Sequence, residues 1–275
     1  MRFEFCLPRP ARLLAYGVLL VTGASGSVQA ATTLKGEGGL VINAPCLSTL
    51  HITANATQPS SVQIDQPLPA GISTSMGKDN VITLTQKNCT ASSPLAPPLT
   101  LSTRPELPLT IENTGRSAVV VDDRTGTLFV QAGSAPVELG KSGELGLVSA
   151  STGPITIRTL ADSARIRSEV AAPVTIKAIT APAIALYLGG KASFTAESGH
   201  LQALEITSAS TQDALVHATT DVGVFHVQSS GNIIVDKVSG TLATERDGSG
   251  KIIPDAAAPP PPEHATRVTV IPEKR

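Results

Sequence analysis

The sequence predicts an all-β protein and, within that class, a β-solenoid. Hydrophobic residues make up 41% of the 275 residues, aromatic residues only 3% and charged residues 16%, with a formal net charge of −1. Val, Ile, Leu and Thr are abundant, and β-branched residues favour strands. Short apolar triplets also recur at a nearly constant interval. This composition argues against a polybasic nucleic-acid binder, a charged coiled coil and a disordered chain.

The triplets consist of two apolar residues that flank a third residue, as in Leu109-Thr110-Ile111 and Ile155-Thr156-Ile157. Such period-2 alternation is typical of a strand with one buried face. Thr-Gly and Ser-Gly pairs lie between triplets, where glycine allows tight turns and the hydroxyl bonds the local backbone. The triplets begin at residues 109, 119, 128, 137, 145, 155, 164, 174 and 184.

Two architectures are compatible with this repeat. An antiparallel β-sandwich would have longer strands and hairpin turns. A β-solenoid would form each coil from two or three short strands and stack the coils about 4.8 Å apart. The small period and the lack of Asn-Gly hairpin signals favour the solenoid, with coils of about 18–20 residues if two triplets form one coil. The outer members of the triplets then point inward, among them Ile157, Ile166, Val174, Ile176 and Leu186.

The first 30 residues have the three parts of a secretory signal peptide. Three arginines among the first twelve residues precede an apolar run at 13–21, and small residues follow up to Ala30 and Ala31. We expect cleavage between Ala30 and Ala31. The run is too short to span a bilayer, and no later run reaches about 18 apolar residues. The mature chain is therefore expected in the periplasm, at the cell surface or in the medium, without a membrane span.

Two cysteines remain after cleavage, Cys46 and Cys89. An even number of cysteines in an exported protein predicts a disulfide. It would close a loop of about 44 residues, for which loop entropy gives a stabilisation of about 3–4 kcal/mol.

The remaining domain boundaries follow composition and pattern. A leader at 31–45 precedes the solenoid at 46–253, and a Pro-rich tail at 254–275 is expected to be mobile. Within the solenoid we expect N-terminal strands at 46–95, a Pro-rich crossing at 96–108, and repeats at 109–253. The repeats are expected to end in a closing hairpin from Thr241 to Ile253 around Asp247-Gly248.

Residues 46–253 resemble a known family. Behind the signal peptide and the alternating strands, the blocks Ser229-Ser230-Gly231-Asn232-Ile233 and Ser151-Thr152-Gly153-Pro154-Ile155 feed short strands. This arrangement resembles the bacterial "putative auto-transporter adhesin head GIN domain" family. The resemblance implies an exported, adhesin-like β-helix, and it supplies no catalytic residues to transfer.

Histidine placement predicts neither a metal site nor a cofactor site. His217 and His226 are nine positions apart, so the repeat would bring them to equivalent places on different strands. A zinc site needs three or four ligands, and only Glu205 and Asp221 lie near them in the sequence. We therefore interpret these histidines as outward-facing polar residues.

Two charged clusters are candidates for catalysis. Asp122-Asp123 precedes a turn, where a capping role is expected. Asp162 with Arg165 and Arg167 is the best available cluster for an enzyme that acts on polysaccharides, although charges in such positions are expected to form a solvated outer face of the strands. Such an enzyme needs carboxylates that converge on a groove with basic groups. The sequence lacks the nucleophile-elbow, phosphate-loop and C-x-x-C motifs.

The predicted function is an exported, non-catalytic adhesin-like or structural module of the bacterial cell envelope, without a cofactor. Its expected partners are envelope proteins or polysaccharide surfaces and not nucleic acid. The alternatives are a polysaccharide-active lyase or hydrolase, favoured by a groove at Asp162, Arg165 and Arg167, and a periplasmic scaffold for envelope assembly.

The cleavage site is directly testable. N-terminal sequencing of the exported protein is expected to give Ala31 as the first residue, because signal peptidase cuts after the small residues that follow the apolar run. Exported protein that begins at Met1 would instead indicate an uncleaved anchor.

Overall fold

The structure, a computed structural model, describes residues 32–58 and 61–255. Within these ranges the chain forms strands and turns, and no helix is present that could cross a membrane. The predicted signal peptide at 1–30, its cleavage between Ala30 and Ala31, and the tail beyond Asp255 lie outside the described residues.

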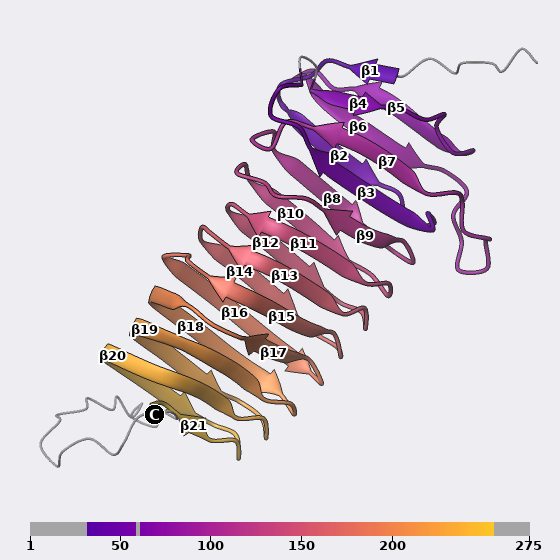
Figure 1. The fold of residues 1–275 in the computed structure, drawn as a ribbon. Helices are drawn as coiled ribbons and strands as arrows, with labels where there is room; N and C mark the ends of the chain where they lie inside the picture. Colours follow the sequence, from indigo (N-terminus) through magenta and orange to yellow (C-terminus); the bar gives the residue numbers. More distant parts are fainter. Residues whose placement is uncertain (1–31, 59–60, 256–275) are drawn as a thin grey trace, which may run out of the picture.

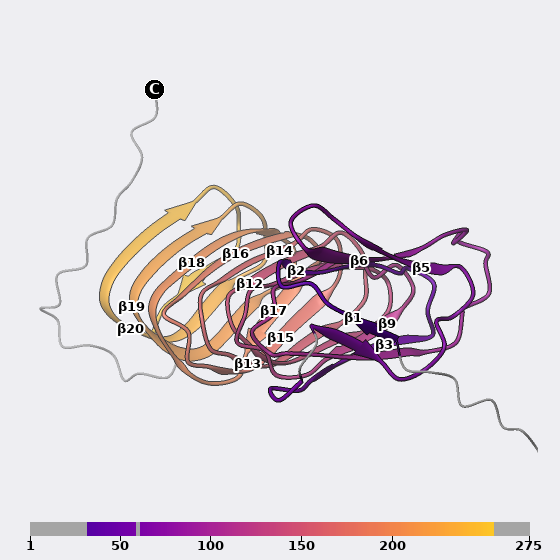
Figure 2. The ribbon, with the colours of Figure 1, turned by 90° about the horizontal axis from the view of Figure 1, so that it is seen from above.

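The strands form two stacks on opposite faces of a β-solenoid (Figures 1 and 2). In spatial order, the first stack contains β5 (Ile72–Met76), β6 (Val81–Gln86), β2 (Gly39–Asn43), β8 (Leu109–Asn113), β10 (Leu128–Ala132), β12 (Leu145–Ser149), β14 (Ala164–Ser168), β16 (Ala183–Gly190), β18 (His200–Ser210) and the C-terminal halves of β19 (Ala214–Val227) and β20 (Ile233–Arg246).

The second stack lies across the core from the first. It contains β1 (Thr32–Leu34), β4 (Val62–Ile64), β7 (Leu99–Thr103), β3 (Thr49–Ala54), β9 (Ala118–Val121), β11 (Val137–Ser142), β13 (Ile155–Leu160), β15 (Pro173–Ile179), β17 (Ser193–Ala196), the N-terminal halves of β19 and β20, and β21 (Ile252–Ile253).

From β8 onward the chain alternates between the two stacks, and each strand pairs in parallel with the strand one coil later. Facing residues are between 17 positions apart, as for Leu128 and Leu145, and 20 positions apart, as for Ile184 and Leu204. The predicted β-solenoid is confirmed, with two triplets in each coil. Only the last coils differ, because β19 and β20 continue through both stacks as single 14-residue strands.

The core is a column of aliphatic side chains between the two stacks. All five residues predicted to point inward are buried: Ile157, Ile166, Val174, Ile176 and Leu186. Phe194 and Phe225 are the aromatic residues of the core among the described residues. The inward assignment of the triplets is therefore confirmed.

At the N-terminal end, the order of the coils in space differs from their order in the sequence. Strand β2 pairs with both β6 and β8, and β3 pairs with both β7 and β9. The coil of β2 and β3 therefore lies between a later coil and the rest of the solenoid. Cys46 follows β2 and Cys89 follows β6, and they form the predicted disulfide, with their Cα atoms 5.8 Å apart. This bond joins corresponding turns of the two exchanged coils.

The Pro-rich segment at 96–108 is only partly the irregular crossing that was expected, because it contains strand β7. Its remainder is held by Arg124, whose side chain donates to Thr103 Oγ1 at 2.7 Å, to the Arg104 carbonyl at 2.9 Å and to the Leu107 carbonyl at 2.6 Å. Burial lowers the pKa of Arg124 to about 10, so the guanidinium stays charged at neutral pH. The burial of Arg124 was not predicted from the sequence.

The expected closing hairpin at Thr241–Ile253 is wrong. The C-terminal half of β20 pairs in parallel with β19, and β21 pairs in parallel with β20. Asp247-Gly248 is a coil corner that packs over Ser229 in the corner of the preceding coil. A short turn signal does not show whether the chain reverses within one sheet or crosses to the opposite face. The antiparallel closing strands β1, β4 and β5 lie at the N-terminal end instead.

The two faces of β15 give a matched pair of substitutions. Ile176→Asp would place an unpaired carboxylate in the dry core and is expected to lower the free energy of unfolding by several kcal/mol. Thr175→Asp lies on the outward side of the same strand and is expected to change it by about 0.5 kcal/mol or less. Urea denaturation followed by circular dichroism measures both. Equal losses of stability would contradict the inward assignment.

Candidate functional site

A row of outward residues crosses the middle of the first stack. Strand pairing places Phe129, Gly146, Arg165, Ala185 and Glu205 side by side on β10, β12, β14, β16 and β18. Since Gly146 has no side chain, the Phe129 ring leans over it, and a Cβ atom at position 146 would lie only 2.9 Å from ring carbon Cδ2. The absence of a side chain at Gly146 therefore leaves a hollow in the outer face of the first stack, and the Phe129 ring packs against its backbone.

This hollow is a shallow depression of about 530 Å³. Its lining includes the small residues Gly146, Ala164 and Ala185 and the charged residues Glu144, Arg165 and Glu205. Arg165 and Glu205 are exposed, and neither forms an ion pair within 32–58 and 61–255. The reason is their register: the cross-strand neighbours of Arg165 are Gly146 and Ala185, and those of Glu205 are Ala185 and Val224. Both groups are available to a ligand.

A second aromatic residue lies on the same face. The Arg167 guanidinium stacks over the Tyr187 ring, 4.7 Å from its centroid, and also pairs with Glu169. Phe129 and Tyr187 are the outward-facing aromatic residues of the described chain, and they flank the two arginines of β14. The two arginines were singled out in the sequence, but their aromatic neighbours were not, because only the coil register brings these residues together.

The candidate cluster of Asp162, Arg165 and Arg167 does not converge. Asp162 lies in the turn before β14, where its carboxylate accepts a hydrogen bond from the Ser163 amide at 2.7 Å. Arg165 and Arg167 point outward from the face of the stack, and no ion pair joins either of them to Asp162 among the described residues. Of the three residues, only Arg165 lines the depression on this face.

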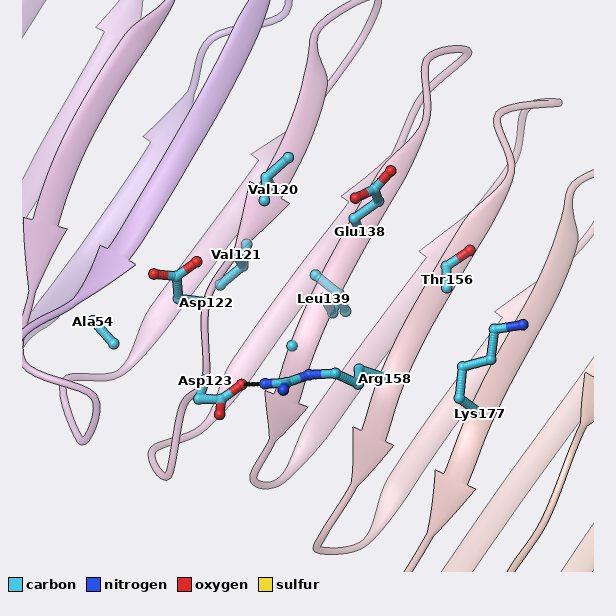
Figure 3. A pocket seen from close by; sticks show the side chains of 11 residues that line it. Ala54, Val120, Val121, Asp122, Asp123, Glu138, Leu139, Thr156, Arg158 and Lys177 are labelled. Carbon is cyan, nitrogen blue, oxygen red and sulfur yellow. Dashed lines mark hydrogen bonds and ion pairs between the residues drawn. The ribbon is translucent and has the colours of Figure 1, made fainter.

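A second depression, of about 670 Å³, lies on the face of the second stack (Figure 3). It brings together the carboxylates of Asp122, Asp123 and Glu138 with the cations of Arg158 and Lys177. These residues come from four successive coils, which is why their convergence could not be read from sequence spacing without the coil register.

Gly140 shapes this second depression. A Cβ atom at Gly140 would lie 2.4 Å from Asp123 Oδ1, so the missing side chain leaves space for that carboxylate. Asp123 accepts a hydrogen bond from the Lys141 amide at 2.7 Å and pairs with Arg158. The hydrogen bond from the Lys141 amide is the main cause that lowers the pKa of the Asp123 carboxyl, and the pairing with Arg158 lowers it further. The turn-capping role expected for Asp123 is wrong, because its carboxylate accepts from the Lys141 amide within β11 of the next coil and not from its own turn.

The other charges around the second depression are partly paired. Asp122 Oδ1 lies 3.2 Å from His51 Nε2, and Lys177 pairs with Glu197 on the next coil. Glu138 has no ion-pair partner among the described residues. Because Asp123 is held ionised, it is poorly suited to donate a proton, as a glycosidase acid must.

The two histidines singled out in the sequence lie on one strand, β19, and not on different strands as expected. His217 Nδ1 lies 3.1 Å from Asp236 Oδ1. His226 lies near two carboxylates, Glu245 and Asp247. Neither Glu205 nor Asp221 is among these partners, so the acidic neighbours come from one coil later in the sequence and were missed.

No family model matches the chain, and no curated protein matches it. Among solved structures, it is similar to a "putative adhesin" from Bacteroides fragilis NCTC 9343, with 17% identity, 81% of this chain and 94% of that chain covered, and a TM-score of 0.45. It is also similar to a "putative adhesin" from Parabacteroides distasonis ATCC 8503, with 13% identity, 81% of this chain and 94% of that chain covered, and a TM-score of 0.43. A "putative lipid binding protein" from the same organism has 10% identity, with 89% of this chain and 96% of that chain covered and a TM-score of 0.39. The family resemblance of residues 46–253 stays a prediction.

The lowered pKa of Asp123 gives a test of the second depression. Its carboxylate stabilises the fold above its unfolded-state pKa, and this contribution is lost as the pH falls through the lower folded-state pKa. Asp123→Asn is therefore expected to lower the free energy of unfolding at pH 7 by on the order of 1 kcal/mol, after allowance for solvent screening. The difference from the native protein should disappear in strong acid. Glu138→Gln, at an unpaired carboxylate, is the control, and an equal loss in both variants would contradict the assignment.

Proposed function

We propose that this chain is an exported, non-catalytic, adhesin-like binding module of the bacterial cell envelope, and that it holds polysaccharide on the outer face of the first stack. The observation that carries the proposal is the grouping of Phe129, Arg165 and Glu205 around one shallow depression, with Tyr187 beside it. The predicted signal peptide and the Cys46–Cys89 disulfide support export, since disulfides persist in oxidising compartments.

The residues of this face suit a sugar chain. A flat aromatic ring offers apolar area at low entropic cost, and the apolar face of a sugar ring can pack on Phe129. Arg165 and Glu205 then supply charge-assisted hydrogen bonds to hydroxyl or carboxylate groups of the sugar. Neither side chain forms an ion pair with the residues that the structure describes, so no ion pair there has to break.

The shape of the face sets the expected affinity. The depression is open and has one aromatic anchor, so a single contact is expected to be weak. The repeating strands extend the surface along the solenoid axis, and a polymer can contact several positions at once. Useful affinity would then come from extended area or from several copies that act together.

The second depression favours a different function, an enzyme that acts on polysaccharides. Three carboxylates and two cations meet there, as such chemistry requires. The pairing of Asp123 with Lys141 and Arg158, and the lowered pKa of Asp123, support a structural role for this carboxylate. We therefore place the enzyme second and a periplasmic assembly scaffold third.

The binding proposal is tested at Phe129. Phe129→Ser and Arg165→Ala are each expected to weaken binding to immobilised bacterial polysaccharides, acidic and neutral, by about tenfold, which corresponds to about 1.4 kcal/mol for a contact at the centre of a site. Biolayer interferometry with the disulfide-intact protein measures the change. Glu138→Gln, on the opposite face, is the control and is expected to bind as the native protein does.

Three results would separate the alternatives. Equal binding by all variants would remove the first-stack face from consideration. Turnover of a polysaccharide that is lost in Glu138→Gln would promote the enzyme. Capture of an envelope protein, with no polysaccharide bound, would favour the scaffold.

A further inference from the structure

His226 lies between two carboxylates near the C-terminal end of the first stack. His226 on β19 faces Glu245 on β20 directly across the strand pair, and Asp247 follows two residues later, just after β20 ends. The ring atom Nε2 lies 3.0 Å from Asp247 Oδ2, and Nδ1 lies 3.7 Å from Glu245 Oε2. The imidazole is only 22% exposed, whereas both carboxylates reach solvent.

This arrangement differs from that of the other histidines in the described residues. His51, His200 and His217 each lie within ion-pair distance of one carboxylate. At His226, one nitrogen and two carboxylate oxygens, each from a different residue, lie within 4.8 Å of one another. Three ligand atoms are the number that open zinc sites in proteins take from the chain, with water in the fourth position.

The donor set points to a particular class of metal. Ca²⁺ and Mg²⁺ prefer oxygen ligands alone, whereas imidazole together with carboxylates suits Zn²⁺ and related transition metals. Zinc bonds of about 2.0–2.1 Å place tetrahedral ligand atoms about 3.3 Å apart. The 3.0 Å between His226 Nε2 and Asp247 Oδ2 is already close to this value. Glu245 Oε2 lies nearest the other ring nitrogen, Nδ1, so this partly exposed side chain has to turn toward Nε2 to complete the site.

We propose that His226, Glu245 and Asp247 bind one Zn²⁺ ion that fastens the last strand of the first stack. Within the described residues, the segment Thr241–Arg246 pairs with β19 on one side only. A metal ion that bridges β19 and the end of β20 would cross-link this edge. It would also neutralise the two carboxylates that meet at His226. The site lies on the same stack as the proposed polysaccharide face, but none of its three residues lines the depression there.

The chemistry of binding is simple. Zinc would bind the lone pair of His226 Nε2 while the ring keeps one proton on Nδ1, so a proton on Nε2 moves to Nδ1 or, from a doubly protonated ring, passes to solvent. The imidazole binds in its neutral form, and both carboxylates bind ionised. No bond of the protein breaks.

Isothermal titration of the untagged, disulfide-intact chain with ZnCl₂ tests the site. One ion is expected to bind per chain, and His226→Gln and Glu245→Gln are each expected to weaken binding at least tenfold. His217→Gln, on the same strand but beside a single carboxylate, is the matched control and is expected to bind as the native protein does. His264→Gln controls for the histidine that lies outside the described residues. CaCl₂ should give no saturable binding.

Hydrogen exchange tests the structural consequence. Zinc is expected to slow exchange of the amides in Thr241–Arg246 in the native protein and not in His226→Gln. Absence of saturable zinc binding, or binding that survives unchanged in His226→Gln, would overturn the site. Zinc binding without slower exchange in this segment would overturn the cross-link.

Discussion

Stacking of aliphatic side chains at a fixed coil length is the constraint on which the rest of this protein depends. Each inward position of a triplet packs on its equivalent 17 to 20 residues later, and the parallel backbone hydrogen bonds hold that register. A shift by one residue would turn every inward side chain outward, so the register is strongly specified wherever the interior is dry. This also explains why large aromatic residues are rare, since the narrow interior is filled by Val, Ile, Leu and Ala.

The same register decides the chemistry of the surface, because every outward residue meets the residue one coil away. Lys177 meets Glu197, and His217 meets Asp236, so these charges are compensated along the solenoid axis. Glycines interrupt these rows at positions 140 and 146, and each lies in a depression. The side chain of a neighbouring strand or turn, Asp123 at Gly140 and Phe129 at Gly146, occupies the space that a Cβ atom would fill. The candidate sites are thus irregularities of a repeat and not separate structures added to it.

Much of the fold could be predicted from the sequence because the repeat is local: alternation, triplet interval and turn residues all lie within about ten residues. The inward residues, such as Ile176, followed from this repeat, whereas the disulfide followed from the even number of cysteines in a chain predicted to be exported. The exchange of the β2–β3 coil with its neighbours could not be predicted, since it depends on pairing between residues far apart, such as Leu40 and Leu109. The buried Arg124 and the partners of His226 were missed for a similar reason. Their contacts cross coils, and the number of strands per coil must be known before they can be located.

The two ends of the solenoid are closed in different ways, and this difference bears on the proposed function. At the N-terminal end, antiparallel strands β1, β4 and β5 cover the stacks, and the Cys46–Cys89 bond joins two of the coils there. At the other end of the described chain, the last strand of the first stack has a partner on one side only, and an open strand edge invites pairing with another chain. Exposed Val222 and Val224 lie beside that edge on β19. A protein that works through its long faces needs this edge to remain closed to other chains, and polar groups such as His226, Glu245 and Asp247 at the edge oppose such pairing even before any ion binds.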